Sequence, residues 1–260
     1  MVDINALAPG RPLSIVTTSN RPIVVERTLT FSRDASGNGY GLTTRLGETR
    51  PAQTWLFAEG STSNRFQTFL TVLNTSQDTA HVTASFYDSR GRLLARKTLA
   101  VTGLRRATLR LNDFLNASGI ASVVTSDRPI VVERPEYFGS PNAPRIAGSD
   151  VFGRIGTSPF WIFPGGDTAG KSEFLLLFNP NRRNVPVRST VYESNGTTAS
   201  STVTLAPRER GAIEVSRRFP GATGQRGEVV RTLDGQGIVV EQTVFAPDHS
   251  TLRSTQGLPA

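Results

Sequence analysis

The strongest constraint on this chain is an internal repeat, because one ten-residue segment occurs twice almost unchanged. Residues 18–27 read TSNRPIVVER and residues 125–134 read TSDRPIVVER, so the two copies differ at a single position. A weaker third copy, GIVVEQ, occupies residues 237–242. The glutamates of the three copies lie 107 and 108 residues apart: Glu26, Glu133 and Glu241. A fixed period of this kind predicts tandem copies of one structural unit.

A second landmark has the same period. The segment WLFAEG at residues 55–60 recurs as WIFPGG at residues 161–166, which is 106 residues later. Between the landmarks the copies stay aligned, since FLTVLN at 69–74 matches FLLLFN at 174–179. Two independent landmarks therefore indicate a period of about 107 residues.

Each copy has the sequence pattern of short strands. Val82, Ala84 and Phe86 alternate with polar or smaller residues, which is the two-residue period of a half-buried strand. The sequences DSRG at 88–91 and ESNG at 193–196 predict hairpin turns, with glycine free to take positive φ. A short turn is expected near residues 112–116. The strands expected in the first copy are 54–58, 67–74, 80–87, 92–101, 105–111, 120–125 and 129–137.

Roughly seven short strands in about 100 residues are typical of an immunoglobulin-like sandwich. We therefore expect an all-β chain of tandem immunoglobulin-like β-sandwich repeats. Trp55 and Phe57 lie on one strand face and are expected to anchor the core of the first repeat. Trp161 and Phe163 are expected to do the same in the second, because one large aromatic side chain buries about 150–250 Å².

The repeat also predicts the domain organisation. We expect the C-terminal half of a repeat at 1–31, a linker at 32–53, a full repeat at 54–138, a linker at 139–159, a full repeat at 160–246 and a tail at 247–260. Strands expected near 12–18 and 22–31 would have no partners of their own, which leaves three interpretations. The chain is a fragment of a longer array, strands from another chain complete the half-repeat, or the half-repeat packs on the first repeat as an extra sheet.

Charge and composition narrow the function classes. The net charge is +8, and nearly all of the positive charge is arginine, since Lys97 and Lys171 are the only lysines. A basic surface favours anionic partners such as acidic glycans or cell wall, although arginine is also an ordinary solvated surface residue. No nucleic-acid-binding motif accompanies the arginines, so no nucleic-acid partner is expected.

No apolar run is long enough for a membrane span, no signal peptide is visible, and there is no cysteine for disulfides or metal binding.

The candidate catalytic and metal-binding residues do not form a recognisable site in the sequence. His81 and His249 are not expected to share a site, and the segment with Asp34 and Asn38 does not fit an EF-hand loop. A carboxylate that recurs once per repeat is better explained as a structural ion pair. If Glu133 is half-buried, its partner is expected to be an arginine that makes two parallel hydrogen bonds. No catalytic, cofactor-binding or metal-binding residue is predicted; the structural landmarks are Trp55, Phe57, Glu133, Trp161, Phe163, Glu241 and Glu26.

The landmarks at 55–60, 69–74 and 126–134 resemble a repeat of large exported proteins in Actinobacteria, Chloroflexi and other bacteria. The pattern of that family is WYFAEG, then LxNP, then SDxPIVxER. The second copy departs from it at residues 164–166, which read PGG in place of AEG, and at Gln242 in place of arginine. The resemblance covers essentially the whole chain. It implies a surface location and a β-sandwich architecture, and it carries no catalytic motif.

From these observations we expect a non-catalytic structural or adhesive segment of a bacterial cell-surface or secreted protein. Strand complementation of the N-terminal half-repeat would allow assembly into a filament or array. The expected partners are other copies or neighbouring repeats, and anionic glycans or cell wall. The alternative is a carbohydrate-binding or accessory module of a larger secreted protein. The expected location is extracellular or at the cell surface.

Overall fold

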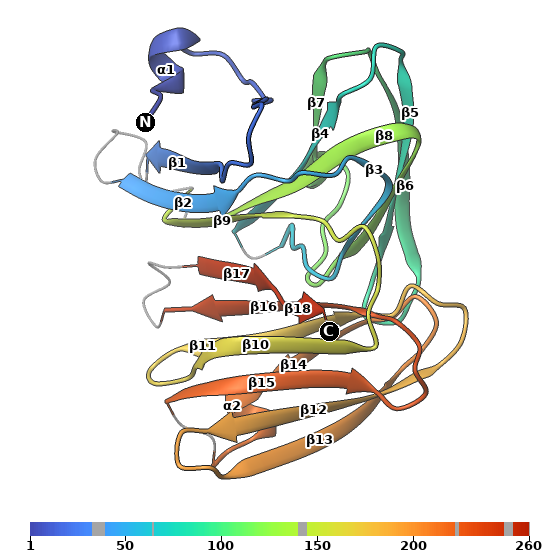
Figure 1. Ribbon diagram of the computed structural model, residues 1–260. Coiled ribbons are helices and arrows are strands. Elements are labelled where there is room, and N and C mark those ends of the chain that lie inside the picture. Colours follow the sequence, from blue (N-terminus) through green and yellow to red (C-terminus); the bar gives the residue numbers. More distant parts are fainter. Residues whose placement is uncertain (33–39, 64, 140–144, 222–223, 247–251, 260) are drawn as a thin grey trace.

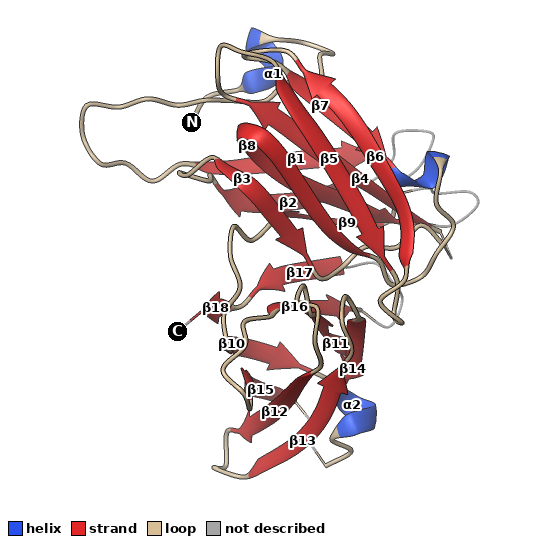
Figure 2. Ribbon diagram, turned by 90° about the vertical axis from the view of Figure 1, so that its right-hand side faces the viewer, coloured by secondary structure: helices blue, strands red, loops and turns tan. Residues whose placement is uncertain are grey.

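The computed structural model covers residues 1–260, and it is described here except at 33–39, 64, 140–144, 222–223, 247–251 and 260 (Figure 1). The regular structure of the described residues is almost entirely β, with antiparallel sheets and a few short helical turns. They form an N-terminal hairpin and two β-sandwiches, which follow one another along the molecule (Figures 1 and 2). The all-β class expected from the sequence is therefore confirmed.

The first sandwich consists of two sheets that share one long strand. Its strands are β3 (Ala52–Phe57), β4 (Phe66–Asn74), β5 (Ala80–Tyr87), β6 (Leu93–Val101), β7 (Arg106–Arg110), β8 (Ala121–Phe138) and β9 (Ala147–Phe152). The first part of β8 pairs with β3 and β5, and its second part pairs with β4 and β9. Two strands were expected where the single strand β8 runs. The chain keeps an extended course through residues 126–129, although Pro129 has no N–H to donate.

The second sandwich has the same strand order. Its strands are β10 (Phe160–Asp167), β11 (Ser172–Phe178), β12 (Val185–Glu193), β13 (Thr198–Leu205), β14 (Arg210–Glu214), β15 (Gln225–Thr232), β16 (Val239–Phe245), β17 (Leu252–Gln256) and β18 (Leu258–Pro259). One sheet has the order β13-β12-β15-β10-β18 and the other has the order β14-β11-β16-β17. Here β15 and β16 replace the single strand β8 of the first sandwich. The DGQG segment at 234–237 separates them, and Gly235 takes a positive φ of 75°.

The two tryptophans have matching surroundings. Trp55 and Phe57 are fully buried in the core of the first sandwich, and Trp161 and Phe163 are buried in the core of the second. Each indole N–H donates to two backbone carbonyls, one three residues earlier and one of the residue that pairs with that position in the sheet. The acceptors are Ala52 and Ile130 for Trp55, and Ser158 and Ile238 for Trp161. The aromatic anchors expected from the sequence therefore lie in the two cores.

Both predicted hairpin turns are present. Gly91 donates to the carbonyl of Asp88, and Gly196 donates to the carbonyl of Glu193. The two glycines have φ values of 73° and 85°, a conformation that costs residues with a Cβ atom. The turn expected near 112–116 is a 3₁₀ turn, η1, one residue earlier at Leu111–Asp113.

The segments expected to be linkers contain strands. The hairpin of β1 (Glu26–Ser32) and β2 (Tyr40–Leu46) extends into the first linker, and β9 and β17 lie in the second linker and the tail. Strands β2 and β17 both contact β9, so three hairpins lie one above another (Figure 1). The sequence of β9, AGSDVF, consists mostly of small and polar residues, which is a composition typical of a turn. Its burial comes from this stacking, which the local pattern does not reveal.

The N-terminal half-repeat forms less regular structure than expected. After a helical turn, α1 (Ile4–Leu7), residues 8–25 form no strand, so the expected strand at 12–18 is absent. The strand expected at 22–31 is shorter and shifted, since β1 begins at Glu26. The hairpin itself packs on the first sandwich, as the third interpretation of the half-repeat supposed.

Candidate functional site: buried polar junctions between stacked units

The two sandwiches meet through an apolar face. Leu56, Ala58 and Ala121 of the first sandwich form one buried cluster with side chains of the second: Leu176, Phe178 and Val239. At its edge the ring of Tyr87 stacks on that of Phe178, with centroids 6.0 Å apart. An apolar interface of this kind holds two domains in a fixed arrangement, because moving them apart would expose the buried apolar side chains to water.

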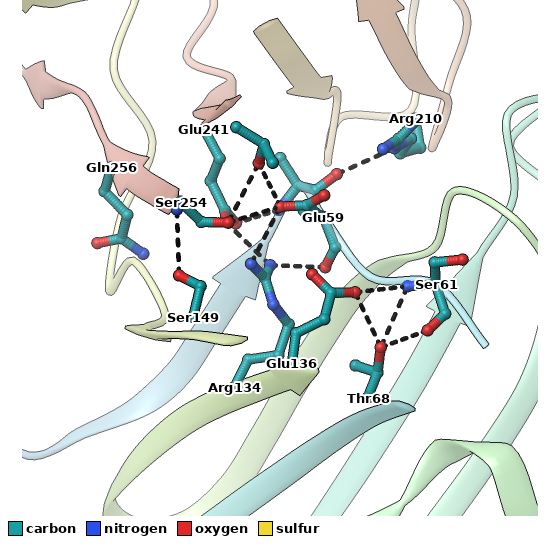
Figure 3. A network of polar contacts seen from close by, with 12 residues as sticks. Glu59, Ser61, Thr68, Arg134, Glu136, Ser149, Arg210, Glu241, Ser254 and Gln256 are labelled. Atoms are coloured by element: carbon teal, nitrogen blue, oxygen red, sulfur yellow. Dashed lines mark hydrogen bonds and ion pairs between the residues drawn. The ribbon is translucent and has the colours of Figure 1, made fainter. Parts of the chain in front are cut away.

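Arg134 lies at the centre of the polar part of this interface (Figure 3). Its side chain, which is only 1% exposed, extends from β8 toward the second sandwich. One guanidinium nitrogen donates to the Glu59 carbonyl oxygen at 2.7 Å and to Oε2 of Glu241 at 2.9 Å. The other nitrogen donates to Oε2 of Glu59 at 3.3 Å. One arginine thus joins carboxylates from both sandwiches in a site that excludes water.

The two carboxylates are held by further donors from the opposite sandwich. Glu241 accepts the backbone N–H of Ala58 at 2.8 Å. Glu59 accepts the hydroxyls of Thr243 at 2.5 Å and Ser254 at 3.2 Å. We call Glu59, Arg134, Glu241, Thr243 and Ser254 the central junction. Every hydrogen bond that joins these five residues across the sandwich interface involves a charged group, so each is stronger than a neutral bond.

Arg210 closes the junction from the side of the second sandwich. Its side chain donates to the carbonyl of Ala58 at 3.2 Å, and its backbone N–H donates to the carbonyl of Asp88. Gly119 lies against the guanidinium, where an added Cβ atom would come within 2.9 Å of a nitrogen. Gly91 meets the carbonyl of Pro207 even more closely. Backbone therefore approaches backbone at this contact, which requires glycine on one side.

A second junction joins the N-terminal hairpin to the first sandwich. The guanidinium of Arg27 makes two parallel hydrogen bonds to Glu133, at 2.5 and 3.1 Å, and also contacts Asp150. The hydroxyl of Thr43 donates to Asp150. We call Arg27, Thr43, Glu133 and Asp150 the N-terminal junction. The expectation that a buried Glu133 is paired with an arginine by two parallel bonds is confirmed.

The two junctions follow one rule. In each, the arginine next to the motif glutamate of one unit binds the motif glutamate of the following unit. Arg27 follows Glu26 and binds Glu133, whereas Arg134 follows Glu133 and binds Glu241. Glu26 itself is exposed on β1. The sequence identified the glutamates, but it did not identify Arg134 as the residue between two sandwiches, because arginine is usually a surface residue.

The junctions are electrostatically unusual because carboxylates outnumber their cationic partners. Burial raises the pKa of Glu133 to about 7 in spite of Arg27. Burial and the charge of Glu59 raise the pKa of Glu136 to about 8, although Thr68 and the backbone of Ser61 donate to it. Burial also raises the pKa of Glu241, again against the charge of its arginine. These groups hold protons more tightly in the folded chain than in water.

The second sandwich contains a separate buried charge cluster. Arg226 pairs with Glu173 and Glu228, and the side-chain amide of Gln242 donates to both carboxylates, at 2.6 and 2.7 Å. Burial and the charge of Glu173 raise the pKa of Glu228 to about 8. An open cavity of about 660 Å³ lies beside this cluster, with Tyr192 among its lining residues. The two glutamates themselves are fully covered, so solvent and ligands do not reach them.

Other candidate residues from the sequence are not gathered into a site. His81 is exposed on β5, where its backbone N–H donates to Asp127. His249, Asp34 and Asn38 lie outside the described residues. Among the described residues, no group of three or more His, Asp or Glu side chains is arranged to hold a metal ion. In the same part of the chain, no helix is long and apolar enough to cross a membrane.

No protein-family model and no curated protein sequence matches this chain. Solved structures are similar only in part. A Thermotoga maritima protein, 1070, is 15% identical with a TM-score of 0.37, over 40% of this chain and 96% of that one. The Anabaena sensory rhodopsin transducer is 27% identical with a TM-score of 0.29, over 33% and 97%. A Streptomyces avermitilis α-L-rhamnosidase is 11% identical with a TM-score of 0.25, over 82% of this chain and 28% of the enzyme. These distant similarities assign no function.

Proposed function

We propose that this chain is a non-catalytic structural segment of a bacterial cell-surface or secreted protein. It consists of tandem immunoglobulin-like repeats with a period of about 107 residues. Its function is to hold successive sandwiches in a fixed line, as a spacer or as a unit of a filament or array. The bacterial surface location follows from the resemblance of the landmarks at 55–60 and 126–134 to exported repeats.

One observation carries this proposal: the same arginine-to-glutamate bond joins consecutive units twice, from Arg27 to Glu133 and from Arg134 to Glu241. A catalytic carboxylate is needed once and must reach a substrate. A structural carboxylate is needed at every contact between units and can be covered. Glu241 is fully buried, and Glu133 is 7% exposed.

The matching surroundings of Trp55 and Trp161 support the repeat itself. Buried asparagines give the same support. Asn74 and Asn179 each bind the backbone of the residue four positions later and of the strand that ends near them. In each copy a buried asparagine thus binds the backbone of the loop that follows its own strand, which is expected if one unit was duplicated.

The proposal predicts a rigid arrangement, which spin labels can test. The chain has no cysteine, so Thr98→Cys and Ser200→Cys provide one exposed labelling site on each sandwich. Pulsed electron paramagnetic resonance should give a single narrow distance distribution. The Arg134→Met variant should broaden it, whereas Arg92→Met, which removes an arginine whose side chain is 67% exposed, should leave it narrow. A broad distribution in the otherwise unaltered chain would overturn the proposal.

A carbohydrate-binding or accessory role is the second candidate, and the cavity beside Tyr192 favours it. Tyr192 is 46% exposed, and Lys171 and Arg253 line the same cavity. An aromatic ring with nearby cations suits an acidic glycan. On a glycan array, binding that is lost in Tyr192→Ala but kept in Leu93→Ala, an exposed position on the first sandwich, would support this role. Absence of binding to acidic glycans would rule it out.

A further inference from the structure

Residues 4–32 and 40–47 have the local structure of the closing half of a sandwich. Each sandwich contains a helical turn in which an N–H donates to the carbonyl four residues earlier, and α1 repeats it. The three bonds run from Ala8 to Ile4, from Leu115 to Leu111, and from Phe219 to Val215. The N-terminal hairpin is closed by Gly47, which donates to Val25 as Gly153 donates to Val132.

Residues 14–25, between the turn α1 and the hairpin of β1 and β2, include apolar residues at positions that are buried in the first sandwich. None of the described residues buries these side chains in the same way. The repeat aligns residues 14–25 with 121–132 of β8. Ile130 and Val132 are fully buried, whereas their counterparts Ile23 and Val25 are 55% and 39% exposed. Figure 2 shows the segment before β1 as a loop that projects away from the sheets. An exposed row of this kind marks an interaction surface, because it leaves apolar side chains in water.

The first sandwich shows what covers such a segment. There, the corresponding part of β8 pairs with β3 and β5, and the next part pairs with β4. Residues 14–25 belong to no strand and pair with none of the strands that the structure describes. The missing counterpart is therefore a set of strands like β3–β7.

The charges of the N-terminal junction agree with this missing counterpart. The side chain of Arg134 is 1% exposed, because Glu59, which follows β3, covers it together with Glu241. The side chain of Arg27 is 38% exposed, with its two carboxylate partners on the first sandwich alone. Arg27 is therefore less enclosed than Arg134 by the groups that the structure describes.

We infer that residues 4–32 bind a five-stranded half-sandwich equivalent to β3–β7, supplied by a neighbouring unit of the same kind. The inference rests on the tandem repeat of the proposed function and adds the partner to it. The partner strand carries the sequence W-x-F-A-E-G, whose tryptophan packs near Ile23 and whose glutamate meets Arg27. A second copy of this chain fits less well, because β8, β15 and β16 already occupy the corresponding places in its two sandwiches.

The test supplies this partner within the full chain. A copy of residues 52–110 is fused directly before Ile4, which is the position that corresponds to Leu111. Hydrogen exchange followed by mass spectrometry should show amides 14–25 exchanging rapidly in the present chain. In the extended chain their exchange should slow by at least about 100-fold, because they enter a strand ladder. Unchanged exchange at 14–25, with both original sandwiches still protected, would overturn the inference.

Variants separate specific docking from collapse. Ile23→Asp with Val25→Asp should leave the melting temperature of the present chain unchanged, and should abolish the new protection in the extended chain. Thr18→Asp is the matched control and should keep the protection, because its counterpart Thr125 is exposed. A stable dimer of the present chain with 14–25 protected would instead identify exchange between copies and overturn the assigned partner. Neither readout depends on the spin-label distance between the two complete sandwiches.

Discussion

Replacing Arg134 by methionine is the sharpest test of the central junction. Methionine keeps the apolar stem and removes the guanidinium, which donates three hydrogen bonds to Glu59 and Glu241. The sulfur cannot replace these donors, so two buried carboxylates lose their cation at once. Removing one partner of a buried ion pair costs about 3–5 kcal/mol, because the remaining charge stays desolvated.

Protonation limits this loss and gives it a pH signature. A carboxylate with an ordinary pKa of 4.5 can become neutral at pH 7 for about 3 kcal/mol, since each pKa unit is worth about 1.4 kcal/mol. At pH 5 the same proton costs only about 1 kcal/mol. Because one proton replaces the one positive charge that is removed, we expect Arg134→Met to lose about 3 kcal/mol of unfolding free energy at pH 7. The loss should shrink to about 1 kcal/mol at pH 5.

Urea unfolding followed by tryptophan fluorescence measures both values, because Trp55 and Trp161 are buried reporters of the two cores. Arg92→Met is the control. Its arginine pairs with Asp88 but is 67% exposed, so its loss should stay below about 1 kcal/mol at either pH. A loss below about 1 kcal/mol for Arg134→Met at pH 7, or a loss that is equal at the two pH values, would refute the reasoning.

Three further predictions follow from the same structure. Three glutamates have pKa values raised from 4.5 in the folded chain, to about 7 or 8, so the folded state binds protons that the unfolded state releases. They are Glu133, Glu136 and Glu228. The free energy of unfolding should therefore rise by at least about 1 kcal/mol as the pH falls from 8 to 5. Glu136→Gln should make it less dependent on pH. A urea midpoint that rises with pH would contradict this prediction. Gly153→Ala should lower the melting temperature, because its Cβ atom would lie 2.7 Å from the ring of Phe57, whereas Gly156→Ala has open space and should not. Asn179→Ala should cost about 1–3 kcal/mol in urea unfolding, because three backbone carbonyls lose the donor that the buried Asn179 amide supplies, and a loss like that of exposed Asn195→Ala would contradict this.

The sequence predicted the strands best where side chains alternate along one core face. The bounds expected for β4 and β5 agree with the structure within one residue, and the turns at Gly91 and Gly196 are correct. These features depend on local periodicity and on backbone conformations that glycine favours. Trp55 and Trp161 were placed in the cores for the same reason, since their strands carry a large aromatic on the inward face.

The contacts between units could not be predicted in the same way. β9 has no apolar alternation, because β2 and β17 pack against it on both sides. Arg134 is fully buried only because Glu241, 107 residues later, lies beneath it. Such burial depends on how two folded units stack, and neither the local pattern nor the usual exposure of arginine contains that information. The recurrence of Glu-Arg at 26–27 and 133–134 was the one available signal.

The central junction explains what changes where the sequence of the second copy differs from that of the first. Three groups of the first sandwich bind the second at the central junction: the N–H of Ala58, the carboxylate of Glu59 and the guanidinium of Arg134. At the corresponding positions the second sandwich has Pro164, Gly165 and Gln242, which offer no N–H, no carboxylate and no charge. Gln242 instead binds the buried glutamates of its own sandwich. The second sandwich therefore lacks the three groups that make this ion pair and its neighbouring hydrogen bond in the first, and two of the substituted positions, Pro164 and Gly165, line the open cavity beside Tyr192.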